Sequence, residues 1–131
     1  MPEGGSPFGS WNGVEAFEFV DGVRLHAIGG DQVLLCRVQY EPGKQVPRHA
    51  HEHTEQLMCV VEGSVTMTIG DETRELGPGD VVCVNRGIEH ELHSAGGVMM
   101  GLMSIMNMRG GARSRPRLAR TECSATRSCG R

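Results

Sequence analysis

The stretch GKQVPRHAHEHTEQLMCVVEG, residues 43–63, places three histidines at alternate positions: His49, His51 and His53. On a β-strand, residues i, i+2 and i+4 point to the same side, whereas a helix scatters them around its circumference. A strand here therefore makes either a metal site or a polar, solvated face. An acid and an amide, Glu55 and Gln56, follow the histidines. Gln56 lies out of phase with them unless the chain bulges before it.

Around this stretch the chain consists of short apolar or alternating runs, separated by Gly, Pro, Asn and Asp. This pattern predicts short β-strands joined by turns, and no segment has the 3.6-residue apolar period of a helix. Strands at this spacing indicate an all-β sandwich or barrel, and closure would protect their edges. TMTIGDETREL (66–76) indicates a hairpin with its turn at Gly70–Asp71. The predicted strands are GVRLHAIG (22–29), DQVLLCRVQY (31–40), QLMCVVEG (56–63), SVTMTIG (64–70), DVVCVN (80–85) and VMMGLMSIMNM (98–108).

The charge is divided unevenly along the 131 residues. Residues 109–131 hold seven arginines and one acid, a net charge of +6, while the rest of the chain carries −9. A segment so basic and so poor in apolar residues is expected to be disordered. The length suits a single folded domain. We therefore expect a flexible N-terminal arm (1–13), one β domain (14–108) and a disordered Arg-rich tail (109–131).

Several classes of protein are disfavoured by composition. No apolar run approaches the roughly 18 residues that a membrane span requires, and the N-terminus has no basic start or apolar core of a secretory signal. The five cysteines are odd in number and contain no C-x-x-C pair, so disulfides and a zinc ribbon are not expected. We expect a cytoplasmic protein that binds neither membranes nor a specific nucleic acid, with its tail attracted to its own acidic body.

Two spaced motifs resemble those of the cupins, a family of small jelly-roll barrels. The first motif, G-x5-H-x-H-x(3 or 4)-E-x6-G, is matched by Gly43, His49, His51, Gln56 and Gly63. The second, G-x5-P-x-G-x2-H-x3-N, is matched in ELGPGDVVCVNRGIEH (75–90) and beyond, with Asn for the proline and Ser for the final asparagine; its positions here are Gly79, Asn85, Gly87, His90 and Ser94. The resemblance implies an all-β cupin fold, the double-stranded β-helix or jelly-roll barrel.

The resemblance also implies a mononuclear metal site. Facing strands of a barrel would bring His49, His51 and His90 onto one divalent transition ion such as Zn, Ni, Fe or Mn, and leave positions open for substrate. The fourth ligand has two candidates. The spacing to Gly63 favours Gln56, which gives a neutral ligand shell, while the shorter permitted spacing selects Glu55, which gives a three-histidine, one-carboxylate centre. His53 then lies either behind the ligands, supporting them, or at the solvent-facing rim, and His26 and His93 are ordinary polar positions.

A glutamine at this position is similar to cupins that open unsaturated uronate rings and to cupin-type polyketide cyclases. The ring-opening group, however, carries an Asp-x-Phe pattern where this chain has Ile105 and Asn107, which argues against that reaction. We expect a metal-dependent enzyme acting by Lewis-acid catalysis on a small oxygen-rich metabolite (isomerase, lyase or cyclase type). The alternatives are a non-haem iron dioxygenase and a non-catalytic small-molecule-binding cupin.

Two further expectations concern packing. The apolar run AFEFV (16–20) lies near one end of the chain, so it is a candidate edge strand for pairing in a homodimer. The methionines at 99, 100, 103, 106 and 108 are expected to fill the core or to form an adaptable apolar wall of the pocket.

Overall fold

The structure, a computed structural model, describes residues 5–105 and consists almost entirely of β-strands. Within this part of the chain no helix is long and apolar enough to cross a lipid bilayer. The all-β prediction is confirmed. A short 3-10 helix, η1 (Trp11–Gly13), precedes β1 (Phe17–Val20), β2 (Val23–Gly29), β3 (Val33–Tyr40), β4 (Gln45–His49), β5 (Gln56–Ile69), β6 (Glu72–Leu76), β7 (Val81–Val84) and β8 (His90–Ser104).

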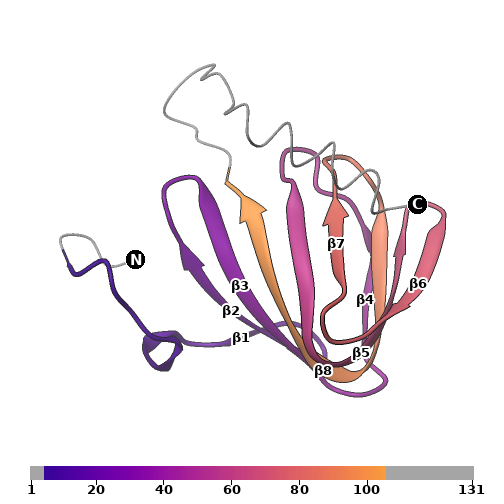
Figure 1. Ribbon diagram of the computed structural model, residues 1–131, viewed down its shortest axis with the longest axis horizontal. Helices are drawn as coiled ribbons and strands as arrows, with labels where there is room; N and C mark the ends of the chain where they lie inside the picture. The colour runs from indigo at the N-terminus through magenta and orange to yellow at the C-terminus, as the bar shows by residue number, and fades with distance from the viewer. Residues whose placement is uncertain (1–4, 106–131) are drawn as a thin grey trace.

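Two long strands, β5 and β8, organise the barrel (Figure 1). The hydrogen-bonded order is β1-β2-β3-β8-β5-β6, with β4 also paired to β8 and β7 to β5. The first part of β8 pairs with β4 and with the end of β5, whereas its second part pairs with β3 and with the start of β5. All these pairs are antiparallel. Because each long strand contributes to both halves, one continuous sheet folds over into the two facing layers of a jelly roll.

Glycines permit the close crossing of β5 and β8. Gly63 pairs with Gly97, and the register of the two strands shifts on either side of Gly63. Gly63 has φ +81°, and a Cβ atom there would collide with the backbone of Gly96 and Gly97. Only glycine satisfies both the left-handed conformation and the lack of space. This explains in physical terms why the first motif ends in glycine.

The core lies between the two layers and is built from alternate residues of the strands. Met99 is fully buried, and Met103 packs against the core, as expected for methionines that fill apolar space. Met106 and Met108 lie outside the described residues. The most deeply buried apolar side chains include Val23, Val38, Val60, Val65, Met67, Val84 and Leu92.

The strand predictions were right in type but not in every boundary. The hairpin is confirmed, because Ile69 pairs with Glu72 around Gly70, whose φ is +64°. The predicted strands 56–63 and 64–70 are a single strand, β5, and β4 was not predicted. The predicted alternation of three histidines on one strand is wrong. The strand β4 ends at His49, and residues 50–55 form a connecting loop before β5, so no bulged strand joins His51 to Gln56.

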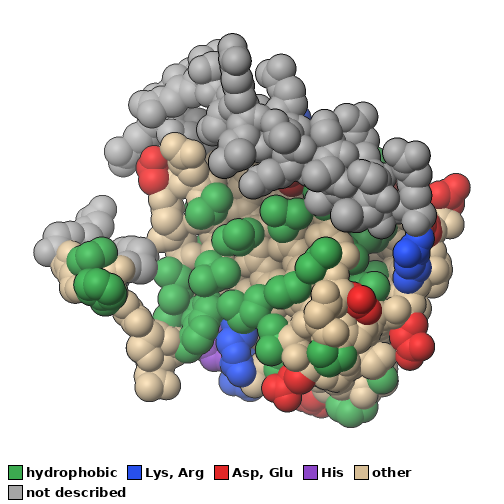
Figure 2. Space-filling view, in the orientation of Figure 1, with side chains coloured by type: hydrophobic (Ala, Val, Ile, Leu, Met, Phe, Trp, Pro, Cys, Tyr) green, Lys and Arg blue, Asp and Glu red, His purple; other side chains and the backbone are tan. Residues whose placement is uncertain are grey.

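Several apolar side chains gather on the outer face of the β3–β8–β5–β7 layer (Figure 2). Leu102 on β8 stands between Leu35 and Leu57 in the register, and Val61 and Val81 are at least half exposed. At the sheet edge, β1 pairs with β2 and carries a half-exposed pair, Phe17 and Phe19. Exposed apolar surface of this extent is typical of protein contacts. The homodimer stays a prediction.

The domain boundaries also stay predictions, because residues 1–4 and the Arg-rich tail (109–131) lie outside the described residues. Within the described part, η1 belongs to the predicted arm and the strands belong to the predicted domain. Three cysteines, Cys36, Cys59 and Cys83, are free thiols. Cys123 and Cys129 lie in the part that is not described.

We predict that Gly63→Ala lowers the free energy of unfolding by about 3 kcal/mol, because the methyl group meets backbone and forces a left-handed alanine. The matched control is Gly77→Ala, since a Cβ at Gly77 meets nothing within 4 Å. Urea unfolding of both variants measures the difference. Equal stability of the two variants would contradict the close crossing.

Candidate metal centre

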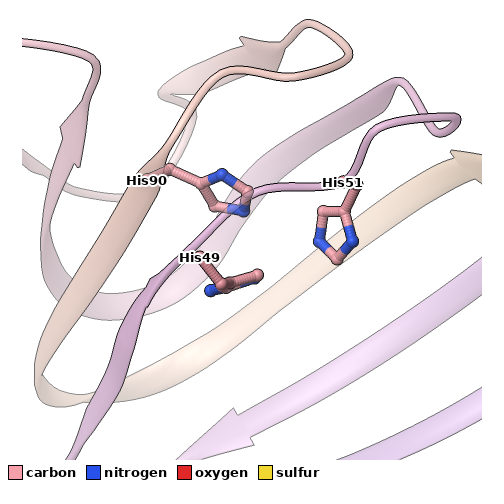
Figure 3. Close-up of side chains that lie close together, drawn as sticks. All are labelled: His49, His51 and His90. Carbon is pink, nitrogen blue, oxygen red and sulfur yellow. The ribbon is translucent and has the colours of Figure 1, made fainter.

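Three histidines from two distant segments of the chain lie close together (Figure 3). His49 is the last residue of β4, His51 lies in the following loop, and His90 is the first residue of β8. One ligand atom of each lies within 4.8 Å of the others. The ring centroids are separated by 4.2 Å (His49–His90), 4.8 Å (His49–His51) and 5.3 Å (His51–His90). Among residues 5–105, this is the group of His, Cys, Asp or Glu side chains with the spacing to hold a metal ion.

Two backbone contacts bring the two motifs together. His49 and His90 are directly opposite each other in the β4–β8 pair. The amide of Gly87 donates a hydrogen bond to the His51 carbonyl oxygen, at 2.8 Å. Gly87 adopts φ +80°, a conformation that side chains disfavour. The glycine of the second motif therefore holds the second histidine of the first.

Carbonyl groups set the tautomers of two of the imidazoles. The Nδ1 atom of His49 lies 2.7 Å from the Pro47 carbonyl oxygen, and Nδ1 of His90 lies 3.0 Å from that of Ile88. A carbonyl oxygen only accepts, so each Nδ1 carries the proton and donates it. In a neutral ring this leaves the lone pair on Nε2, which is the form that ligates a metal.

The electrostatic surroundings favour neutral imidazoles. Burial lowers the pKa of His51 below its ordinary value, and His49 lowers it further. Burial also lowers the pKa of His90, and the nearby His49, His51 and Arg48 add to this against the opposing bond from Ile88. Because imidazole ligates only when deprotonated, these shifts keep the site ready for a metal near neutral pH.

An ion pair behind the site was not anticipated from the sequence. Arg48 contacts Glu89 at 3.1 Å and donates to the Gly70 carbonyl oxygen at 2.7 Å. These two charged residues immediately precede His49 and His90 in the chain, so the pair links the two ligand-bearing strands from outside. The sequence does contain a signal for this ion pair, because residues of opposite charge precede His49 and His90. An exposed pair contributes little stability, so its effect is mainly on position.

Gln56 stands at the inner wall beside these histidines. It opens β5, alternates with the buried Met58 and Val60, and pairs with Met103 on β8. Its Oε1 atom is buried and has no hydrogen-bond partner. Buried polar atoms are nearly always bonded, so an orphaned oxygen in the same cavity lining as three imidazoles is available to ligate an ion. The donor set therefore fits a divalent transition metal, with His49, His51, His90 and Gln56 as the residues able to hold it.

A cavity of about 120 Å³ opens from this cluster into the barrel, and Gln56 and the three histidines line one part of it. Tyr40 also lines it, and burial raises the pKa of the phenol well above its usual range, so the hydroxyl remains protonated. The rest of the wall is apolar and includes Val38, Val46, Met58, Met67, Leu92 and Met103.

The other candidate residues lie elsewhere. Glu55 is outside the cavity lining, and its backbone is tied to Ser104 by two hydrogen bonds, at 2.9 and 3.0 Å. His53 and His93 are exposed. His26 packs edge-on against Trp11, with ring centroids 6.1 Å apart, and does not join the cluster.

Comparison with known proteins identifies the family. Residues 36–106, more than half of the chain, match the model of the cupin domain, and the protein belongs to the cupin family. Its fold is similar to that of an RmlC-like cupin from Shewanella frigidimarina (TM-score 0.72, 19% identity, 79% of this chain and 95% of that one). It is also similar to a sugar phosphate isomerase of the cupin superfamily from Silicibacter pomeroyi (TM-score 0.66, 18% identity, 76% of each chain).

Among curated sequences the chain is similar to the tetracenomycin polyketide synthase protein TcmJ of Streptomyces glaucescens, with 25% identity over 72 residues (55% of this chain and 48% of that protein). The matched region spans less than half of the length of the first curated relatives. The structural likeness, at these low identities, shows the fold. The predicted resemblance to small RmlC-like cupins is confirmed.

We predict that replacing His49, His51 or His90 with Ala reduces zinc binding by at least about tenfold, because each removes one of four ligands. His26→Ala and His93→Ala are the controls and keep full occupancy. Each variant is equilibrated with one equivalent of zinc, and its zinc content is measured by inductively coupled plasma mass spectrometry. Full occupancy in His90→Ala would rule out this centre.

The pH dependence of metal binding follows from the lowered pKa values of His51 and His90. Protons compete with the metal for Nε2, so affinity is complete above the imidazole pKa and is lost as pH falls through it. Because burial lowers both values, we predict that the loss begins below about pH 6.5, the ordinary histidine value. Zinc affinity measured by chelator competition tests this. A steep loss already between about pH 8 and 7 would contradict it.

Proposed function

We propose that this cupin is a metal-dependent enzyme that holds one divalent transition ion through His49, His51, His90 and Gln56. We propose that it acts by Lewis-acid catalysis on a small oxygen-bearing metabolite, in a reaction of the isomerase, lyase or cyclase type. The observation that carries the proposal is the buried, unbonded Oε1 of Gln56 beside three imidazoles of defined tautomer.

The ligand charges favour this chemistry over oxidation. Three neutral imidazoles and one amide oxygen leave the full charge of a divalent ion, which polarises the oxygen atoms of a bound molecule. A carboxylate in the fourth place would offset part of that charge. Glu55, the available carboxylate, lies outside the cavity lining. Two similar proteins are named as a sugar phosphate isomerase and a polyketide synthase protein. Both names are consistent with Lewis-acid catalysis on oxygen-bearing substrates.

The chain's own residues supply the remaining functions. The carbonyl groups of Pro47 and Ile88 accept the Nδ1 protons of His49 and His90, so the Nε2 lone pair of each ring would be free to ligate an ion. The aliphatic wall offers water no hydrogen-bond partners, and a bound molecule that displaced water from the cavity would strengthen the electrostatic interactions inside it. Tyr40 adds a protonated hydroxyl to the cavity wall.

The second candidate is a non-haem iron dioxygenase, which the three-histidine cluster favours because three such ligands suffice to hold iron. Metal analysis of the protein as isolated separates the two. Zinc or nickel with turnover and no oxygen consumption supports the Lewis acid. Iron with oxygen uptake supports the dioxygenase, and no turnover with any metal supports a binding protein.

The fourth ligand is tested by a matched pair of variants. We predict that Gln56→Ala lowers metal affinity by about 10- to 100-fold, because it removes the ligating oxygen, while Glu55→Gln changes it by less than about twofold. Isothermal titration with zinc measures both. The opposite pattern, a large loss in Glu55→Gln and tolerance of Gln56→Ala, would overturn the neutral ligand set and move the dioxygenase to first place.

A further inference from the structure

We infer that the cavity selects small molecules with two neighbouring oxygen atoms at one end and an apolar body, such as β-dicarbonyl compounds, rather than sugars. This inference rests on the proposed metal site and narrows its substrate class. It is carried by the distribution of polar groups along the cavity wall and by the cavity's size.

The polar groups of the wall gather at one end. Gln56 pairs with Met103, whereas Tyr40 pairs with Gly97, six residues away along β8. At about 3.3 Å per residue this separates the two levels by roughly 20 Å. The wall between them is aliphatic, and Val38, Val46 and Leu92 are among its residues. A small molecule bound at the histidine and Gln56 end therefore meets aliphatic side chains over the rest of its surface.

Glu91 borders the cavity as well but does not change this distribution. It lies between His90 and Leu92 on β8, and both of those residues are buried on the inner face. Since successive side chains of a strand alternate, the carboxylate of Glu91 is directed to the other face. The inner wall around the middle of the cavity is thus without charge.

A sugar ring does not match such a wall. Its hydroxyl groups project on all sides, and each one buried against aliphatic side chains loses its bonds to water without a replacement. Every such hydroxyl lowers affinity by roughly tenfold. Two neighbouring oxygens on an otherwise apolar molecule, in contrast, both reach the metal end and leave methyl or methylene groups for the wall.

The volume supports the same class. The cavity measures about 120 Å³, and an apolar protein cavity of about 150 Å³ accommodates one benzene molecule. A ligand enclosed here has roughly the size of benzene or pentane-2,4-dione (acetylacetone). A hexuronate has about twice as many non-hydrogen atoms and would extend beyond that volume.

Acetylacetone and malonate make a matched pair of probes. Both offer two oxygens to a metal in the same chelate ring, and they differ in carrying methyl groups or further carboxylate oxygens at the ends. Titration of the zinc-loaded full chain with each probe gives two affinities. Each is divided by the affinity of the same probe for zinc held by nitrilotriacetate. We expect the protein to favour acetylacetone by at least about tenfold after this correction; an equal or reversed preference would overturn the inference.

A pair of methionine variants assigns the preference to the wall. Met103 lines the cavity and pairs with Gln56 on the neighbouring strand. Met100 points to the outer face, because its neighbour Met99 is fully buried on the inner one. Met103→Gln keeps the side-chain length and is expected to reduce acetylacetone affinity by roughly five- to tenfold while zinc still binds. Met100→Gln is expected to change neither. Unchanged acetylacetone affinity in Met103→Gln would refute the role of the wall.

This experiment distinguishes a failure of the proposed metal site from a failure of the inferred substrate class. If the protein takes up no zinc, the proposed metal site is wrong. If zinc binds at one equivalent but malonate is favoured, the metal site stands and the inferred substrate class is wrong.

Discussion

The site depends on the contact between two distant segments of backbone, residues 49–51 and residues 87–90. The pairing of His49 with His90 and the hydrogen bond from Gly87 to His51 hold three imidazoles within reach of one ion. Neither contact involves a metal ligand's side chain. The scaffold therefore orders the histidines before any ion binds, so the site is preorganised and ion binding does not have to offset the entropy of ordering them.

This constraint explains why both motifs contain glycines at fixed distances from their histidines. Gly87 reaches the His51 carbonyl in a left-handed conformation, and Gly63 lets β5 cross β8 at backbone contact. The crossing belongs to the register in which Gln56 pairs with Met103, and both residues line the same cavity as the histidines. Gly63 thus acts on the site through strand register, and Gly87 acts on it through its hydrogen bond to His51.

The fold followed from the sequence because motif spacing and turn residues are local signals. The hairpin at Gly70 and the all-β architecture needed no tertiary information. The length of β5 did, since Gly63 reads as a turn in isolation and becomes a strand residue only when Gly97 packs against it. The strand β4 was missed because Pro47 and three polar residues obscure its alternation, and it forms through pairing with β8.

The three histidines that motif spacing selected, His49, His51 and His90, are the ones that lie together. Gln56 lines the same cavity, and its role as the fourth ligand stays a prediction. The expected arrangement of the first-motif residues on one bulged strand was wrong, because His51 lies in a loop that a distant glycine anchors. The ion pair of Arg48 and Glu89 was equally hidden, since its partners are 41 residues apart and no periodicity joins them.

We propose that three imidazole nitrogens and the Gln56 amide oxygen bind one divalent metal ion. Anomalous diffraction from crystals of the zinc-loaded protein, collected at the zinc absorption edge, locates such an ion. We expect one anomalous peak, about 2.0–2.2 Å from Nε2 of His49, His51 and His90 and from Oε1 of Gln56. A peak coordinated by the Glu55 carboxylate, or a peak elsewhere with none among the histidines, would contradict it.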